Sequence, residues 1–344
     1  MSIDNQPFGA HRPITLHDVA KRAGVSVSTA SNALTGARHV GQASIERVLL
    51  SAAELGYRRN EVARSLRTGL RNTIGLVIPD VTNPFFADVV KTVENLSHEI
   101  GWSVLLCNTD FDSGREAGYL AGLTSSADGI LLFSTAPDEK TVRALVDMGV
   151  SVVAGDEILH VEGMGGVFSD NVGGGRLAAE HLIASGGRRF GLIEGPHHLT
   201  TAAERAKGFV EGLEAHGRMI ETRNRVRKPY SLEGGREALR ELMQRDPTID
   251  AVFASTDMQA IGAIFEGEDL GFSVPGRLMV CGFDGISWSE RIHPSLTTLQ
   301  QDTVQLATRA FEMLIDMVVN GGAASIVTLP VELIERESTR RTLR

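Results

Sequence analysis

Cysteine, aromatic residues and long apolar runs are all scarce in this chain, and each absence excludes a class of protein. Only Cys107 and Cys281 are present, both within apolar runs, so we expect buried reduced thiols rather than a disulfide framework or a metal site. Aromatic residues make up 5% of the chain, which predicts a mainly aliphatic core. No apolar run is long enough to span a bilayer, and none follows a cationic start as in a secretory signal. We therefore expect a cytoplasmic protein with no membrane partner.

Basic residues are concentrated near the N-terminus, although the chain as a whole is acidic. Residues 1–71 hold ten Lys and Arg against five Asp and Glu, a net charge of +5. The full chain has a net charge of −9, which leaves −14 for the remainder. A basic head on an acidic body is expected when only one end of a protein contacts a polyanion.

Residues 15–34 predict two short helices around a tight turn. Thr15 can cap the first helix, with Asp18 at its third helical position. Gly24 supplies the turn, and Ser26 can cap the second helix. The side chains expected to pack between the helices are Ala20, Val25, Ala30 and Leu34. A slim polar helix braced by another fits the major groove of DNA, and a small helical bundle without a ligand is the alternative.

From Asn72 onward, apolar strand candidates alternate with amphipathic helices. We predict strands at 73–79, 102–107, 129–134, 151–155, 190–195, 251–256 and 278–283. We predict helices near 85–100, 114–124, 138–148, 172–185, 203–216, 233–245, 257–270 and 302–320. Strand–helix alternation predicts parallel sheets covered on both faces. So many strands favour two similar subdomains with a cleft between them.

Polar residues follow the predicted strands, at the edge where open α/β sheets bind ligands. These positions are 80–86, 108–110, Ser134, Asp156, 195–201, 256–257 and Asp284. Their carboxylates and hydrogen-bonding groups suit a polar or polyhydroxylated small ligand.

Two other short sequence segments do not indicate a cofactor-binding or metal-binding site. Gly173-Gly174-Gly175 lacks the lysine and the spacing of a nucleotide-binding loop, so we interpret it as a helix start. His197-His198 has no carboxylate or cysteine at metal-ligand spacing. No signature places a nucleophile beside a general base. We expect no cofactor, no metal and no enzymatic activity.

A series of motifs runs in order from Thr15 to about Ser338. The head carries DVAKRAGVS, ELGY and ARSLRTG, and the body carries IGLVIPDVTNPFF, DGILLFS, SDNVGGG, AAERAKGF, STDMQAIGA, GFDG, HPSLTTL and LIERES. Together these motifs resemble the lac repressor (LacI/GalR) family of bacterial transcription regulators. The resemblance implies an all-α helix-turn-helix head with a hinge helix, followed by an α/β body. The body would have two Rossmann-like subdomains and resemble type I periplasmic binding proteins.

The resemblance also implies domain boundaries. After a flexible tail, 1–13, we expect the DNA-binding domain, 14–59, the hinge helix and linker, 60–71, and the effector-binding and dimerisation domain, 72–344. The subdomains of the last are expected at about 72–171 plus 300–328, and at 172–299 plus 329–344.

In the family, the second head helix reads bases in the major groove. The matching reading positions here are Val27, Ser28 and Asn32. Contacts to phosphates or nearby base edges are implied for Thr15, Ser26, Thr29, Ser31, His39 and Tyr57. Many relatives have Arg at position 32, and because Asn pairs best with adenine, we hypothesise adenine at that operator position.

Residues 60–67 resemble the hinge helix, which orders in the family when two copies meet over the operator centre. Leu66 matches a leucine that enters the minor groove, Ala63 a dimer contact and Asn60 a further DNA-binding position. An apolar wedge between base steps kinks the duplex. Arg59 stands where relatives usually have proline. Proline would fix the backbone conformation before the hinge helix, whereas Arg59 lacks that restriction and adds a positive charge. An ordinary amphipathic linker helix is the alternative.

The cleft residues implied by the resemblance are Phe85, Phe86, Asp156, Thr201, Arg205, Tyr230, Thr256, Asp257 and Asp284. Arg205 with Asp284 could bind vicinal hydroxyls or a carboxylate, and a structural ion pair between subdomains is the alternative. Either phenylalanine could instead belong to the core. Many relatives have Asp-Arg where this chain has Asp156-Glu157, which leaves the particular sugar open.

The resemblance implies a homodimer that binds a palindromic double-stranded DNA operator and a small polar effector, such as a sugar or similar metabolite. Most relatives repress transcription. No heptad-bearing tail follows the body, which favours a dimer over a tetramer. A solute-binding protein, an enzyme and a regulator controlled by a partner protein are the other classes.

Overall fold

The computed structural model describes residues 14–35, 39–57, 69–134 and 138–340. The chain forms two compact units, a head over residues 1–71 and a body over residues 72–344. The predictions for the tail and for Asn60, Ala63 and Leu66 of the hinge lie outside the described residues.

The head is built from α1 (Leu16–Ala23), α2 (Val27–Thr35) and α3 (Gln42–Leu55). Both predicted helices are confirmed, and α3 is an addition. Thr15 and Asp18 form a reciprocal capping box on α1, and Gly24 ends that helix in a left-handed conformation. The small core of the head contains Val19, Ala20 and Ala30 from α1 and α2, with Val48 and Ala52 from α3.

One sheet of the body is entirely parallel, in the order β11-β5-β4-β3-β1-β2. Its strands are β1 (Thr73–Ile78), β2 (Ser103–Asn108), β3 (Gly129–Leu132), β4 (Ser151–Gly155), β5 (Gly165–Ser169) and β11 (Ile326–Leu329). The helices of this lobe are α5 (Pro84–Glu99), α6 (Ser113–Ser126), α7 (Glu139–Asp147) and α12 (Thr303–Asn320). We call this part lobe 1.

The other sheet has the order β12-β10-β9-β8-β6-β7, with only the β10–β12 pair antiparallel. Its strands are β6 (Phe190–Glu194), β7 (Arg225–Arg227), β8 (Ala251–Ala254), β9 (Met279–Asp284), β10 (Thr297–Gln301) and β12 (Val331–Ile334). The helices of this lobe are α8 (Asn171–Ala184), α9 (Thr200–Ala215), α10 (Leu232–Arg245) and α11 (Asp257–Asp269). We call this part lobe 2.

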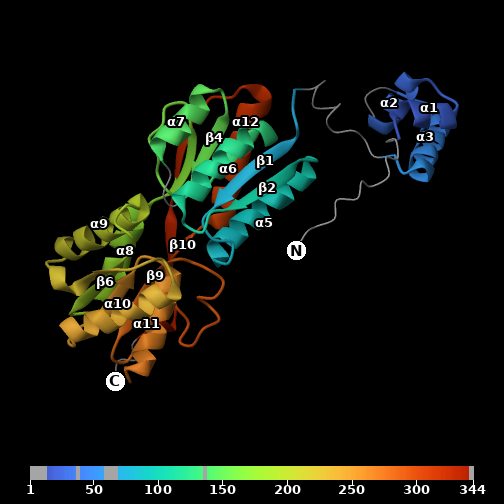
Figure 1. The fold of residues 1–344 in the computed structure, drawn as a ribbon. Coiled ribbons are helices and arrows are strands. Elements are labelled where there is room, and N and C mark those ends of the chain that lie inside the picture. The colour runs from blue at the N-terminus through green and yellow to red at the C-terminus, as the bar shows by residue number, and fades with distance from the viewer. Residues whose placement is uncertain (1–13, 36–38, 58–68, 135–137, 341–344) are drawn as a thin grey trace, which may run out of the picture. The chain divides into compact units, whose positions relative to one another are not determined.

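The chain crosses between the lobes three times: from β5 to α8, from β10 to α12, and from β11 to β12 (Figure 1). Residues that follow β1, β4 and β8, and the last residue of β9, line one cleft between the lobes. The prediction of two α/β subdomains is confirmed. All seven predicted strands are present, whereas β5, β7, β10, β11 and β12 are additions.

The two cysteines are unpaired, and Cys281 is buried as expected, whereas Cys107 is only partly buried. Within the described residues, no helix has the length and apolar character that crossing a membrane requires.

Candidate functional site

The exposed start of α2 is a surface of hydroxyl groups around one apolar side chain. Val27 is 42% exposed, and Ser26 and Ser28 are also exposed. The Oγ of Ser26 accepts a hydrogen bond from the backbone N–H of Thr29 at 3.0 Å and lies 2.8 Å from the Oγ of Ser28. Ser26 therefore caps α2 and fixes its first turn. The third predicted reading residue, Asn32, is partly buried, as is Ser31, which is predicted to contact a phosphate or a nearby base edge.

The remaining predicted DNA contacts lie around this helix pair with different roles in the head. Thr15 is partly buried, and its hydroxyl donates to the Asp18 carboxylate at 2.6 Å. His39 is exposed before α3. Tyr57 packs against the core of the head just after α3. Thr15 and Tyr57 therefore also contribute to the structure of the head.

A narrow, nearly closed cleft lies between the lobes of the body. It is lined by Asn83, Phe85, Phe86, Phe111, Asp156, Thr201, Arg205, Tyr230, Thr256 and Asp284. All the predicted cleft residues except Asp257 lie in this lining. Asn83 was predicted only as part of the 80–86 segment, and Phe111 was not predicted.

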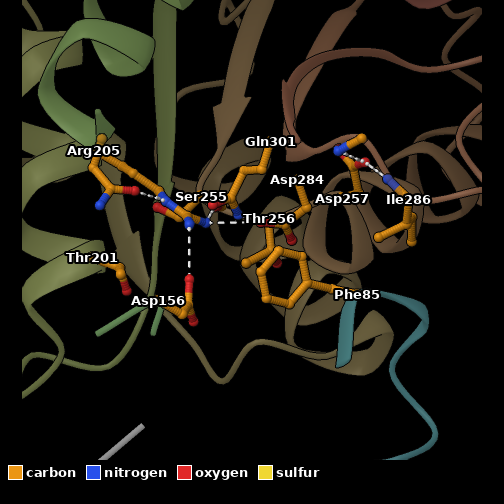
Figure 2. A network of polar contacts seen from close by, with 12 residues as sticks. Phe85, Asp156, Thr201, Arg205, Ser255, Thr256, Asp257, Asp284, Ile286 and Gln301 are labelled. Carbon is orange, nitrogen blue, oxygen red and sulfur yellow. Dashed lines mark hydrogen bonds and ion pairs between the residues drawn. The ribbon is translucent and has the colours of Figure 1, made fainter. Parts of the chain in front are cut away.

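Arg205 is the central cation of this cleft, although it is only 2% exposed. Its Nη1 donates to the Asp284 carboxylate at 3.1 Å and to the Ser255 carbonyl at 2.7 Å. Its Nη2 lies 3.9 Å from the Asp156 carboxylate, which comes from lobe 1. Figure 2 shows Arg205 between these two acids, with Gln301 donating to Asp284 at 2.9 Å. The guanidinium therefore joins the two lobes.

The carboxylates beside Arg205 are poorly solvated. Burial raises the pKa of Asp156 to about 7, against the opposing effect of the Arg205 charge. Burial likewise raises the pKa of Asp284 to about 7, with Arg205 again opposing. Burial also disfavours the charge of Arg205, but Asp284 outweighs it together with other neighbours, and the Arg205 pKa is raised. The cleft thus holds acids that change protonation near neutral pH.

Three buried polar atoms near Arg205 have no hydrogen-bond partner among the described residues. They are the Tyr230 hydroxyl, the Ser255 hydroxyl and the Gln301 side-chain carbonyl. Buried polar groups are rarely left unsatisfied, so these atoms are candidates for bonds to a bound polar molecule.

Apolar contact in the cleft comes from three phenylalanines. Phe85 and Phe86 are both buried, and their rings meet edge to face with centroids 5.0 Å apart. Each also belongs to the main hydrophobic core, so lining and core roles coexist. Phe111 differs from these two because it is 49% exposed.

Strained backbone is concentrated at the cleft. Four of the five described non-glycine residues with positive φ are located there or beside it: Asp110 at 52°, Phe111 at 60°, Asp156 at 69° and Asp284 at 122°. For a bulky residue such as Phe111 this conformation is an outlier, and such strain often marks ligand sites. Local sequence gave no signal for it.

Asp257 lies outside the cleft lining, and its predicted role there needs correction. Its carboxylate accepts hydrogen bonds from the backbone N–H groups of Gly285 and Ile286 at 2.8 and 2.9 Å, and from the Ser289 hydroxyl at 2.6 Å. The Thr298 hydroxyl donates to it as well. Figure 2 shows Asp257 directed toward Ile286. The side chain therefore holds the segment after β9, because its acceptor positions are filled by the protein.

These features define a class of protein: a small helical head with a polar recognition helix, joined to a two-lobed α/β body with a ligand cleft. Residues 15–60 match the family described as bacterial regulatory proteins, lacI family, and residues 179–339 match the periplasmic binding protein-like domain.

Full-length relatives agree with this match. A ribose operon repressor of Halalkalibacterium halodurans is 35% identical over 95% of this chain and 97% of its own. The transcriptional repressor PurR of Proteus mirabilis is 32% identical over 94% of this chain and 96% of its own. The solved complex of the transcriptional regulator CelR with cellobiose is 31% identical and covers 94% of this chain and 99% of its own, with a TM-score of 0.71.

The chain belongs to the lacI family of bacterial regulatory proteins. It is thus a DNA-binding regulator with a periplasmic-binding-protein-like body, and the curated relatives named above are repressors rather than enzymes.

Proposed function

We propose that this chain represses transcription from a palindromic operator as a homodimer, under the control of a small polar effector bound in the cleft. The observation that carries this proposal is the buried Arg205, which bonds carboxylates of both lobes beside unsatisfied polar atoms. A ligand that bonds to this set contacts both lobes and so responds to their separation.

The chemistry of the cleft favours an uncharged, hydroxyl-bearing effector such as a sugar. One guanidinium already pairs with two acids, so an added phosphate or carboxylate would have to compete with Asp156 and Asp284 for Arg205. Hydroxyls can donate to these carboxylates and accept from Arg205 at the same time. The names of the ribose operon repressor and of the cellobiose complex support this class.

A purine is the second candidate effector. Phe85, Phe86 and Phe111 line the cleft and offer aromatic surface to a flat ring.

In the head, we propose that α2 reads bases through Val27, Ser28 and Asn32. The phosphate contacts are proposed for Thr15, Ser26, Thr29, Ser31, His39 and Tyr57. The hinge residues Asn60, Ala63 and Leu66 would contact the operator centre as two copies meet. Cytoplasmic location follows from binding to bacterial DNA.

The proposal is tested by selecting sheared genomic DNA on the purified chain at physiological salt, then sequencing the bound fraction. We expect one enriched palindrome. The same duplex is then titrated with the chain in the presence of ribose, cellobiose or hypoxanthine, to find which ligand changes operator affinity. No enriched sequence, with or without metabolite extract, would refute the proposed regulator.

A further inference from the structure

Glu157 is a buried carboxylate that connects the two lobes without contacting Arg205. It follows β4 in lobe 1 and is 4% exposed. Its Oε2 accepts from the backbone N–H of Thr200 at 2.9 Å, and its Oε1 and Oε2 lie 3.4 and 3.3 Å from the backbone nitrogen of Thr201. Both threonine hydroxyls also donate to it. All these donors belong to the first turn of α9, in lobe 2.

The helix that Glu157 contacts lacks a capping side chain of its own. The residue before α9 is Leu199, which makes no side-chain cap hydrogen bond. The other long helices of the body are each capped by the residue that precedes them: Asn83, Asp112, Asp138, Asp170, Ser231, Thr256 and Asp302. A helix start has unsatisfied N–H groups and favours a nearby negative charge. Glu157 therefore supplies from lobe 1 the cap that lobe 2 does not provide.

The contact is reciprocal across the lobes. The backbone N–H of Ile158, the residue after Glu157, donates to the Thr200 hydroxyl at 3.3 Å. Separation of the lobes would break this bond together with those of Glu157. Water would then replace the carboxylate at the start of α9.

We propose that Glu157 is a positioning residue that latches the lobes together in the absence of any ligand. Its capping hydrogen bonds form only while β4 and α9 are apposed, so their free energy favours the closed cleft. The closure equilibrium of this chain is therefore set in part by its own carboxylate, and an effector acts on an already biased equilibrium. This goes beyond the proposed function and requires neither DNA nor effector for its test.

The test measures the distance between the lobes in the full-length, ligand-free chain. Nitroxide labels are placed at Met148→Cys in lobe 1 and Met219→Cys in lobe 2, which are exposed in the structure, in a Cys107→Ser background. Labelled chains are diluted with excess unlabelled chain so that only distances within one chain are read. Pulsed electron–electron double resonance then gives the distribution of distances between the two labels for each variant.

We expect one dominant short distance with Glu157, and a longer second population with Glu157→Ala. The ratio of open to closed chains should rise about fivefold to tenfold, as for the loss of a helix cap. Glu157→Gln, which keeps one acceptor oxygen and most of the volume, should lie between the two. Glu162→Ala, an exposed glutamate in the same loop, is the matched control and should match the parent.

Amide hydrogen exchange at residues 200–202 separates a latch from a purely local cap. Glu157→Ala is expected to accelerate exchange there and also to lengthen the distance between lobes. Faster exchange with an unchanged distance distribution would show that the carboxylate only caps α9, and this would overturn the latch. If the chain proved not to be a repressor, both measurements would still test the latch, because neither uses operator or effector.

Discussion

At the scale of single residues, the cleft is dominated by one buried cation and the acids around it. Arg205 stacks on the Phe283 ring at 3.9 Å from the ring centroid, and it bonds Asn171 as well as Asp284. Removing one member of such a buried set leaves another charge uncompensated, which typically costs about 3–5 kcal/mol. The cleft residues are therefore expected to contribute to folding as well as to binding.

Acid burial in the cleft predicts a pH dependence of stability. The pKa of Asp156 is raised from 3.8 to about 7, so between about pH 4 and pH 7 the folded chain holds a proton that the unfolded chain has lost. Stability contributed by this group is present at low pH and is lost as pH rises toward 7. Asp156→Asn removes the titrating group, so the variant should not lose this stability as the pH rises. The free energy of unfolding of the variant minus that of the parent should therefore be at least ~1 kcal/mol larger at pH 8 than at pH 5.

Urea unfolding at both pH values measures this difference. Asp147→Asn, at an exposed acid of α7, is the control and should show no such change. An Asp156→Asn difference that is equal at pH 5 and pH 8 would contradict the buried-acid interpretation.

Asn32 predicts the base preference of one operator position. Asn makes paired hydrogen bonds with adenine and Arg with guanine, and a good pair discriminates by about 1–3 kcal/mol. Asn32→Arg should therefore change the preferred base from adenine to guanine, as measured by a binding selection on randomised half-sites. The exposed Gln42→Ala substitution on α3 is the control. An unchanged preference in Asn32→Arg would refute the reading role of this residue.

At the scale of elements, residues at the start of a helix both line the cleft and hold the neighbouring loop in place. The start of α11 places Thr256 in the cleft lining, while the next residue, Asp257, turns behind it and holds residues 285–298. One helix start therefore serves both the site and the loop that follows β9.

Loss of the Asp257 carboxylate should release that loop. Asp257→Ala leaves the buried donors of Ile286, Ser289 and Thr298 and the partly buried N–H of Gly285 without their acceptor, which is expected to cost at least ~3 kcal/mol of unfolding free energy. Amide exchange over residues 285–298 should accelerate. Asp269 is an exposed acid at the end of α11 that pairs with Arg236 of α10, and Asp269→Ala should cost less than ~1 kcal/mol. Equal effects of the two substitutions would show that Asp257 is not a structural anchor.

At the scale of the whole molecule, the head and the body differ in the sign of their net charge. The net charge of residues 1–71 is +5, whereas that of the complete chain is −9. A basic head attracts DNA, and an acidic body discourages non-specific contact with it. The proposed regulation then requires a coupling free energy between the head and the cleft.

Such coupling must be reciprocal for binding equilibria. If the effector changes the operator dissociation constant by some factor, saturating operator must change the effector dissociation constant by the same factor. Fluorescence anisotropy gives the first ratio, and calorimetry with and without operator duplex gives the second. An operator with a scrambled half-site is the control. Unequal ratios would show that the cleft and the head are not linked through a single equilibrium.

The sequence by itself determined the features that depend on neighbouring residues. Thr15 with Asp18, and Gly24 after them, specify where α1 begins and ends. Continuous apolar runs such as 129–134 specify buried strands, because a strand covered on both faces needs apolar side chains in both directions. The strand β5, with its two glycines, and the partly exposed β11 and β12 lack that signal.

Only the tertiary structure decided which side chains meet. Thr256 and Asp257 are neighbours in sequence, but one lines the cleft and the other anchors a loop. Glu157 hydrogen-bonds with Thr200 and Thr201, and Phe111, which has a positive φ, lies in the cleft lining. The physical reason is that the environment of a side chain depends on contacts between segments far apart in sequence, which local periodicity and capping patterns do not encode.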